Sequence, residues 1–133
     1  MIFVDASLFL AYYGTKDVLH KNAKELWPKI ESDVYGPTFT SDYVFNEVVG
    51  VVRRKVGKEA ACILGNQIKE TTVIVNIDNH MFEESWRLFN KTETELSLVD
   101  CSSIIVCTLA KTKHIATFDK EFKKIEEIEV VER

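Results

Sequence analysis

Short apolar runs alternate along this chain with longer amphipathic segments, and this alternation constrains the fold more than any other feature. The apolar runs are rich in β-branched and aromatic residues, as buried strands are, and lie at 2–4, 38–40, 72–77, 114–117 and 128–131. Long segments with helical periodicity separate them, and such crossovers connect parallel neighbours. The sequence therefore predicts an α/β fold with a central, mostly parallel five-stranded sheet and helices on both faces.

The segments between the strands have the spacing and the end signals of helices. We expect helices at 7–13, 20–30, 42–55, 58–69, 79–90 and 99–111, and a single helical turn at 120–124. Ser41 and Asp78 stand directly before two of these segments, where their side chains can cap the first turn. Pro28 lies inside the second segment and is expected to kink or shorten it, because proline removes one backbone donor.

The length and the cysteine pattern fit one intracellular domain. All 133 residues are assigned to a single domain, 1–133, because the chain shows no repeat or linker. Its three cysteines form no CxxC pair, so neither a zinc site nor a disulfide framework is expected, and free thiols favour the reducing cytoplasm. The first residues lack the basic region of a signal peptide, and no run of about 18 apolar residues predicts a membrane span.

The chain is acidic, with a formal net charge of −4 and a pI near 5.4. Proteins that only bind nucleic acid are usually basic, so the composition argues against a simple nucleic-acid-binding module. It does not exclude an enzyme that acts on nucleic acid, because acidic residues that hold cations make a working site locally positive.

Two aspartates follow predicted strands. Asp5 ends the first strand, and Asp119 comes after the strand that ends near Thr117. The carboxyl ends of parallel strands meet at one edge of a sheet, where ligands gather in open α/β folds. Each aspartate is equally suited to capping the short helix that follows it, and the sequence alone leaves that alternative open.

Two further acids stand in apolar surroundings. Glu47 lies in the middle of an expected helix, among valines and a phenylalanine, and Asp100 opens another apolar helix. An unpaired charge is costly in such surroundings, which points to a function. The structural alternatives are a cap role for Asp100 and a salt bridge from Glu47 to Arg53 or Arg54.

These four acids predict a metal site if they converge. Carboxylates that share one edge of a sheet repel each other, and their pKa values rise unless a cation neutralises them. Oxygen-only ligands suit Mg²⁺ or Mn²⁺. Such ions polarise a phosphoryl group, activate water and steady the leaving oxygen, so the pattern favours metal-dependent phosphodiester hydrolysis without a histidine or cysteine nucleophile.

Four stretches of the chain resemble the motifs of one known family. They are Phe3-Val4-Asp5-Ala6-Ser7, Asn46-Glu47-Val48-Val49, Leu96-Ser97-Leu98-Val99-Asp100-Cys101-Ser102-Ser103 and Ala116-Thr117-Phe118-Asp119-Lys120-Glu121-Phe122. In this order and spacing the chain resembles PIN domains, particularly the toxin halves of bacterial and archaeal toxin–antitoxin pairs. One departure is mild: Cys101 and Ser102 stand where small aliphatic residues are more usual.

The resemblance implies a divalent-metal-dependent endoribonuclease that hydrolyses RNA and leaves 5′-phosphate and 3′-hydroxyl ends. It makes Asp5, Glu47, Asp100 and Asp119 the acidic quartet that binds Mg²⁺ or Mn²⁺. Asp5 and Asp100 would be the principal ligands. Glu47 would ligate the metal or orient its water, and Asp119 would complete the site.

The resemblance also implies supporting residues and partners. Ser7 and Thr117 match polar positions that support the acids, and Ser103 lies one helical turn after Asp100 on the same face, where it is equally consistent with an ordinary helix serine. PIN domains of this kind form homodimers. In toxin–antitoxin pairs an antitoxin covers the acidic groove.

A basic group follows the helix that carries Glu47. Arg53, Arg54 and Lys58 either contact RNA phosphates or form a solvated helix end that suits the helix dipole. The sequence leaves both interpretations open.

Other functions remain to be weighed against a toxin ribonuclease. A PIN nuclease that works in RNA processing would use the same acids, and a scaffold that binds a partner without catalysis would not need all four. A haloacid-dehalogenase-type phosphatase needs Asp-x-Asp after the first strand, and a response-regulator receiver needs an acidic pair there. The chain offers only Asp5-Ala6-Ser7 at that place, so both folds fit poorly.

Overall fold

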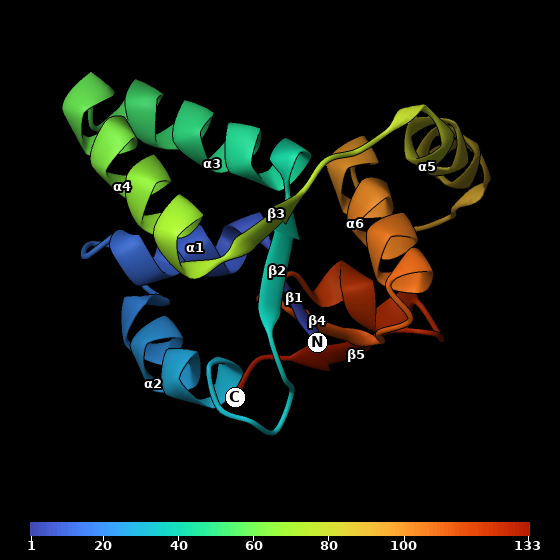
Figure 1. Cartoon of the computed structure of the whole chain (residues 1–133), viewed down its shortest axis with the longest axis horizontal. Coiled ribbons are helices and arrows are strands. Elements are labelled where there is room, and N and C mark those ends of the chain that lie inside the picture. The colour runs from blue at the N-terminus through green and yellow to red at the C-terminus, as the bar shows by residue number, and fades with distance from the viewer.

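The computed structural model describes residues 1–133, and its centre is a sheet of five strands (Figure 1). The strands are β1 (Ile2–Val4), β2 (Thr38–Ser41), β3 (Val73–Val75), β4 (His114–Ala116) and β5 (Glu129–Val131). Their order in the sheet is β3-β2-β1-β4-β5, and every neighbouring pair is parallel. The predicted parallel sheet is thus confirmed, with β1 in the centre.

Helices cover both faces of this sheet, as predicted. They are α1 (Ala6–Tyr13), α2 (His20–Ile30), α3 (Asp42–Lys55), α4 (Lys58–Thr71), α5 (Asn79–Lys91), α6 (Leu98–Leu109) and the 3-10 helix η1 (Lys120–Lys124). Ser41 caps α3 and Asp78 caps α5, each by accepting a backbone N–H of the first turn. None of the helices is both long and apolar enough to cross a membrane.

Several elements begin or end one or two residues away from the expectation, and three differences have a clear local reason. β3 is shorter than the expected 72–77, since only three of its residues pair with β2. α6 ends at Leu109 because Lys111 has a φ of 57°, which a right-handed helix does not tolerate. α2 continues past Pro28 to Ile30, so the expected shortening is wrong. The proline sits in the last turn, where it removes a single backbone bond.

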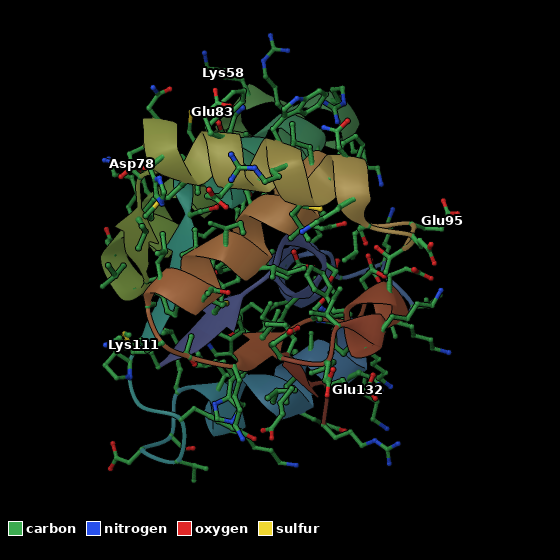
Figure 2. The ribbon with its side chains drawn as sticks, turned by 90° about the vertical axis from the view of Figure 1, so that its right-hand side faces the viewer. Lys58, Asp78, Glu83, Glu95, Lys111 and Glu132 are labelled. Atoms are coloured by element: carbon green, nitrogen blue, oxygen red, sulfur yellow. The ribbon has the colours of Figure 1, made fainter.

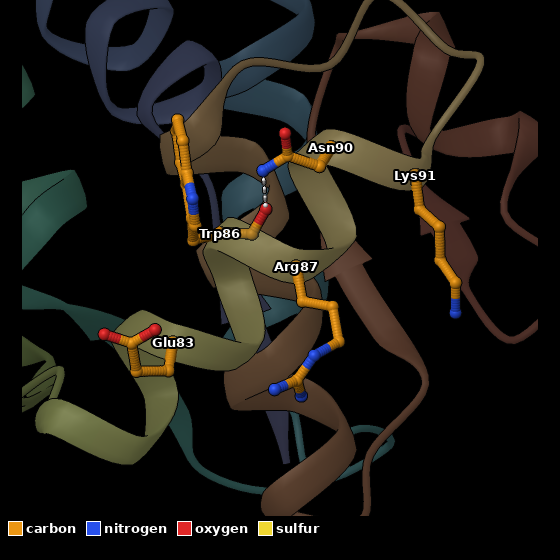
Figure 3. Close-up of a pocket in the computed structure, with 5 residues that line it drawn as sticks. All are labelled: Glu83, Trp86, Arg87, Asn90 and Lys91. Carbon is orange, nitrogen blue, oxygen red and sulfur yellow. Dashed lines mark hydrogen bonds between the residues drawn. The ribbon is translucent and has the colours of Figure 1, made fainter.

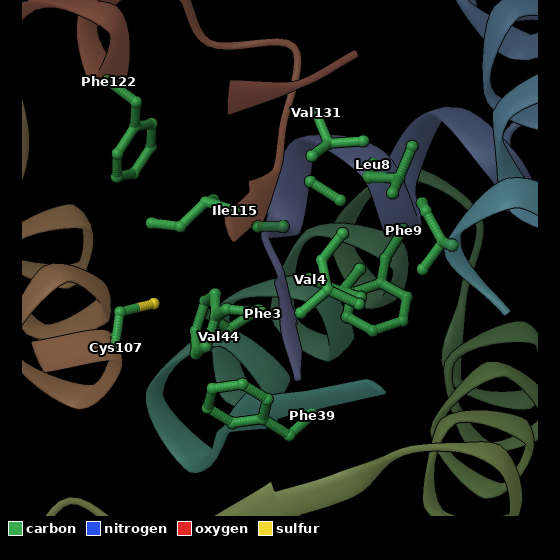
Figure 4. Close-up of a cluster of buried hydrophobic side chains, with 14 of the residues drawn as sticks. Phe3, Val4, Leu8, Phe9, Phe39, Val44, Cys107, Ile115, Phe122 and Val131 are labelled. Carbon is green, nitrogen blue, oxygen red and sulfur yellow. The ribbon is translucent and has the colours of Figure 1, made fainter. Parts of the chain in front are cut away.

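The hydrophobic core lies on both sides of β1 (Figure 4). Phe3 points to one face, where its ring centroid lies 5.3 Å from that of Phe39 and α6 packs over the pair. Val4 points to the other face, where α1 supplies Leu8 and Phe9. Alternate residues of a strand face opposite sides, so a strand covered on both faces needs apolar side chains at every position.

The carboxyl ends of the strands form the edge at which α1, α3 and α6 begin. The Thr112 hydroxyl donates to the Met1 carbonyl at 2.6 Å, which places the end of α6 at the opposite edge, beside the start of β1. Figure 2 shows Lys111 and Glu95, which flank α6 in the sequence, on opposite sides of the molecule. The fold therefore brings three helix starts and the ends of β1 and β4 to a single edge.

Candidate functional site

Asp5 follows β1 directly, and only 3% of its surface is exposed. Its Oδ2 atom accepts hydrogen bonds from the Thr117 hydroxyl at 2.7 Å and from the Ser7 hydroxyl at 3.0 Å. Its backbone N–H donates to the Ala116 carbonyl at 3.0 Å and joins the ends of β1 and β4. Asp5 occupies the N-cap position of α1, as the cap alternative expects, but its side chain makes no capping hydrogen bond to the helix, so the carboxylate does not act as the cap.

The two hydroxyls that hold Asp5 each carry one hydrogen, and both donate it to the carboxylate. Their oxygens can then only accept. Ser7 Oγ accepts from the Phe118 N–H at 3.0 Å, and Thr117 Oγ1 accepts from the Asp119 N–H at 3.0 Å. This network matches an ionised Asp5 and fixes the segment after β4 against the carboxylate.

Asp100 stands inside the first turn of α6 rather than before it. The Ser97 hydroxyl accepts from the Asp100 N–H at 3.1 Å, and Asp100 Oδ2 accepts from the Ser97 N–H at 2.9 Å. This reciprocal pair is a capping box, with Ser97 as the N-cap. The interpretation of Asp100 as the cap itself is therefore wrong, because the helix begins at Leu98, one residue earlier than expected.

Glu47 lies in the second turn of α3, and its side chain is exposed to solvent on one side while the protein partly desolvates its carboxylate on the other. The expectation of apolar surroundings is wrong, because Val44 and Val48 turn into the core and leave Glu47 at the border of the buried face. The alternative salt bridge to Arg53 or Arg54 is also absent, since none of the five ion pairs of the chain includes Glu47.

Asp119 caps the short helix η1. Its Oδ1 atom accepts from the Glu121 N–H at 2.9 Å. The alternative that Asp119 acts as a cap is therefore confirmed. The side chain can still accept further hydrogen bonds or bind a cation, because a carboxylate has about four lone-pair sites and the capping bond uses one of them.

The charges of neighbouring acids shift the titration of Asp100 and of Glu47. The pKa of Asp100 is raised to about 6, first by burial and further by the charges of Asp5 and Asp119. Burial raises the pKa of Glu47, and the charges of Asp5 and Asp100 add to that rise. Burial also raises the pKa of Asp5, while its hydrogen bonds from the two hydroxyls oppose the rise. The structure thus gathers the predicted acids at one edge.

The chemistry of this donor set fits a divalent cation. All four side chains offer carboxylate oxygens, and none of them takes part in an ion pair with lysine or arginine. No three His, Cys, Asp or Glu side chains form a group that could hold a metal ion by themselves. An open arrangement of this kind suits an ion that keeps several waters and is shared with a substrate phosphate.

The remaining predicted residues lie apart from the acids. Ser103 is buried in α6, and its hydroxyl donates to the Val99 carbonyl at 3.2 Å rather than to an acid. Arg53, Arg54 and Lys58 are exposed where α3 meets α4 and form no ion pair. That junction is at the far end of α3 from the carboxyl edge of the sheet (Figure 1).

Two residues that hold the acids in place were not predicted. Ser97 caps α6, and the Ser-x-x-Asp spacing to Asp100 is the signal that identifies it. Glu121 Oε2 accepts from the Glu95 N–H at 3.0 Å. No local pattern announces this second bond, because its partners lie 26 positions apart in the sequence.

The family described as PIN domain matches residues 2–128, which is nearly the whole chain. The chain belongs to the PIN domain family. The expected family is thereby confirmed, while the roles of individual acids stay predictions.

Relatives of this PIN domain are named as endonucleases and toxins. It is 30% identical to the 23S rRNA-specific endonuclease VapC20 of Mycobacterium tuberculosis, over 98% of both chains. The crystal structure of M. tuberculosis VapC20, described as a Sarcin-Ricin loop cleaving toxin, has a TM-score of 0.83 at 24% identity and matches 95% of each chain. A toxin–antitoxin complex from Klebsiella pneumoniae has a TM-score of 0.71 at 17% identity, over 97% of this chain and 96% of that one.

Replacing the hydroxyl that holds Asp5 tests the network. Thr117→Val removes one donor to the buried carboxylate and the acceptor of the Asp119 N–H, so we expect unfolding to become easier by about 1–3 kcal/mol. The pKa of Asp5 should rise further, as a carbon-13 NMR titration would show. Thr108→Val is the matched control, because its hydroxyl only returns to the Ile104 carbonyl of its own helix. An unchanged Asp5 titration in Thr117→Val would contradict the network.

The raised pKa of Asp100 predicts a change in stability with pH. Its folded pKa, about 6, exceeds the ordinary value of 3.8, so the ionised carboxylate destabilises the fold, and this cost grows as pH rises from about 4 through 6. Asp100→Asn keeps an oxygen for the Ser97 N–H. In EDTA it should melt a few degrees above the parent at pH 7.5, with the gap closing near pH 4.

The control for this melting experiment is Glu59→Gln, which neutralises an exposed acid in the first turn of α4. It should not raise the melting temperature at pH 7.5. An Asp100→Asn protein that melted below the parent at pH 7.5 would show that the ionised Asp100 carboxylate does not destabilise the fold.

Proposed function

We propose that this PIN domain is a divalent-metal-dependent endoribonuclease that hydrolyses phosphodiester bonds of RNA, and that it is the toxin of a toxin–antitoxin pair. The observation that carries the proposal is the edge of acids at which the charges of Asp5 and its neighbours raise the pKa values of Glu47 and Asp100, while none of the four acids is paired with lysine or arginine. The relatives named as an rRNA endonuclease and as toxins support the same activity. The RNA substrate and the three free thiols favour the cytoplasm.

Mg²⁺ or Mn²⁺ is the cofactor that we propose for this edge, because all donors are carboxylate oxygens. Asp5 and Asp100 would be the principal ligands, and Asp119 would complete the site. When bound, the ion polarises the scissile phosphate and makes water a better nucleophile. Glu47 would ligate the ion or orient the attacking water, and its raised pKa makes its carboxylate a stronger proton acceptor than an ordinary glutamate.

The supporting residues act by fixing where the carboxylates point. Ser7 and Thr117 hold Oδ2 of Asp5, so the position of this carboxylate does not depend on a bound ligand. Ser97 does the same for Oδ2 of Asp100. Preset ligand positions lower the cost of assembling a site when the ion and the substrate arrive. Ser103 would support the site only through the packing of α6.

RNA binding away from the acids is assigned to the junction of α3 and α4. Arg53, Arg54 and Lys58 are exposed and unpaired there, so their charges are available to phosphates. Arg53 lies six positions after Glu47 in α3, or roughly 9 Å along the helix axis. A bound strand would therefore have to run along α3 to touch both regions.

The partners that we propose are an antitoxin protein and a second copy of the chain. Solved structures with this fold include toxin–antitoxin complexes. For self-association, α5 offers an exposed apolar stripe in which the Trp86 ring stacks on Phe89 with centroids 5.9 Å apart, and Phe82 is 38% exposed one turn earlier. Figure 3 shows this outer side of α5, where polar Arg87 and Asn90 border Trp86. A monomer in sedimentation equilibrium would rule out the homodimer.

The nuclease activity has a direct test. Purified protein should cleave RNA with Mg²⁺ or Mn²⁺ and stop in EDTA, with products that carry 5′-phosphate ends. Asp5→Asn and Asp100→Asn each remove one ligand charge and should lower the cleavage rate by about 100-fold or more. Asp78→Asn is the control, since it makes the same chemical change at a helix cap outside the site. Equal cleavage by Asp100→Asn and the parent would refute the assignment.

Expression in a bacterial host separates the toxin from a nuclease of RNA processing. We expect growth arrest from the parent chain and normal growth from Asp100→Asn at equal protein level. RNA cleavage in vitro without growth arrest would favour the processing role. A chain that bound no Mn²⁺ at millimolar concentration in calorimetry would instead be a catalytically silent scaffold.

A further inference from the structure

The loop between α5 and α6 is held by side chains at four consecutive backbone N–H groups. The donors and acceptors are Thr94 to Thr92 Oγ1 at 3.2 Å, Glu95 to Glu121 Oε2 at 3.0 Å, Leu96 to Thr94 Oγ1 at 3.3 Å, and Ser97 to Asp100 Oδ2 at 2.9 Å. Three of these bonds are local. Of the four bonds, only the one from Glu95 to Glu121 reaches a distant part of the chain.

Glu121 is joined to the acidic edge from its other side as well. Its backbone N–H donates to Asp119 Oδ1 at 2.9 Å. Glu121 is therefore hydrogen-bonded both to the Glu95 loop and to one of the four acids. Its second carboxylate oxygen, Oε1, accepts from Lys124 Nζ at 2.8 Å, which fixes the rotation of the side chain. Figure 2 shows Glu95 on the loop that faces η1.

We propose that Glu121 is a positioning residue that sets the separation between Asp100 and Asp119. A short series of hydrogen bonds connects these two acids. Asp119 accepts from the Glu121 N–H, and the Glu121 carboxylate accepts from the Glu95 N–H. Ser97, two residues after Glu95, forms the capping box with Asp100. This inference rests on the proposed metal-dependent activity, because it matters only if both acids serve one ion and one substrate.

The consequence for the site is a change in affinity rather than in chemistry. Residues that hold a ligand without touching the metal commonly contribute 10- to 100-fold to metal affinity. Removal of the Glu121 carboxylate frees the Glu95 loop and lets the start of α6 move relative to η1. Leu96 stays buried at 3% exposure, so the loop keeps its anchor in the core and the fold survives the change.

Three variants separate the hydrogen bond from the ion pair. Glu121→Ala loses both interactions, Glu121→Gln keeps an oxygen for the Glu95 N–H but loses the pair, and Lys124→Met loses only the pair. Mn²⁺ affinity is measured by calorimetry, RNA cleavage as kcat and KM, and the Glu95 amide by hydrogen exchange. We expect Glu121→Ala to weaken Mn²⁺ binding about 10-fold and lower kcat, with KM and melting temperature near the parent values.

The other two variants should bind Mn²⁺ within about 2-fold of the parent. Faster exchange of the Glu95 amide should appear in Glu121→Ala alone. Parent-like Mn²⁺ affinity in Glu121→Ala, or a loss in Lys124→Met as large as in Glu121→Ala, overturns the positioning role. If the parent itself binds no Mn²⁺, the proposed nuclease fails instead, and the exchange of the Glu95 amide still reports whether Glu121 holds the loop.

Discussion

A carboxylate that leaves water must replace the hydrogen bonds it loses, and the Asp5 side chain does so with two hydroxyls from opposite ends of the chain. Ser7 comes from the first helix and Thr117 from the segment after β4. The same hydroxyl oxygens accept the backbone N–H groups of Phe118 and Asp119, so the bonds that favour the ionised form of Asp5 also shape the loop that carries another acid. The same two hydroxyl groups therefore stabilise the buried charge and determine the geometry of the loop.

This hydrogen-bond network around Asp5 depends on the parallel sheet. β1 lies between β2 and β4, and its end meets the end of β4 directly through the bond from the Asp5 N–H to the Ala116 carbonyl. Most of this arrangement could be predicted from the sequence, because long crossovers demand parallel neighbours and apolar strands demand cover on both faces. The limits of β3 and α6 could not be predicted. They depend on which residues find a strand partner and on the left-handed backbone of Lys111.

The site was predictable in its composition and not in its fine geometry. Strand ends and family motifs identified the four acids, but periodicity placed Glu47 among apolar neighbours when its helix turns it to the border of the core. Asp100 was interpreted as a cap because serine and aspartate, the two members of a capping box, are both common N-cap residues. Only the residue at which the helix begins shows which of the two is the cap. The hydrogen bond between the Glu95 N–H and the Glu121 carboxylate could not be predicted, because no local sequence preference encodes a bond across 26 positions.

The bond from Thr117 to Asp5 spans 112 positions, and this has a consequence for synthesis on the ribosome. A nascent chain that lacks its last segment has β1 and Asp5 but neither β4 nor the hydroxyl that helps to keep the carboxylate ionised. Domains fold as units during translation, and here the unit closes only when its final strands emerge. A chain that ends before β4 therefore lacks both the strand that pairs with β1 and the Thr117 hydroxyl that donates to Asp5.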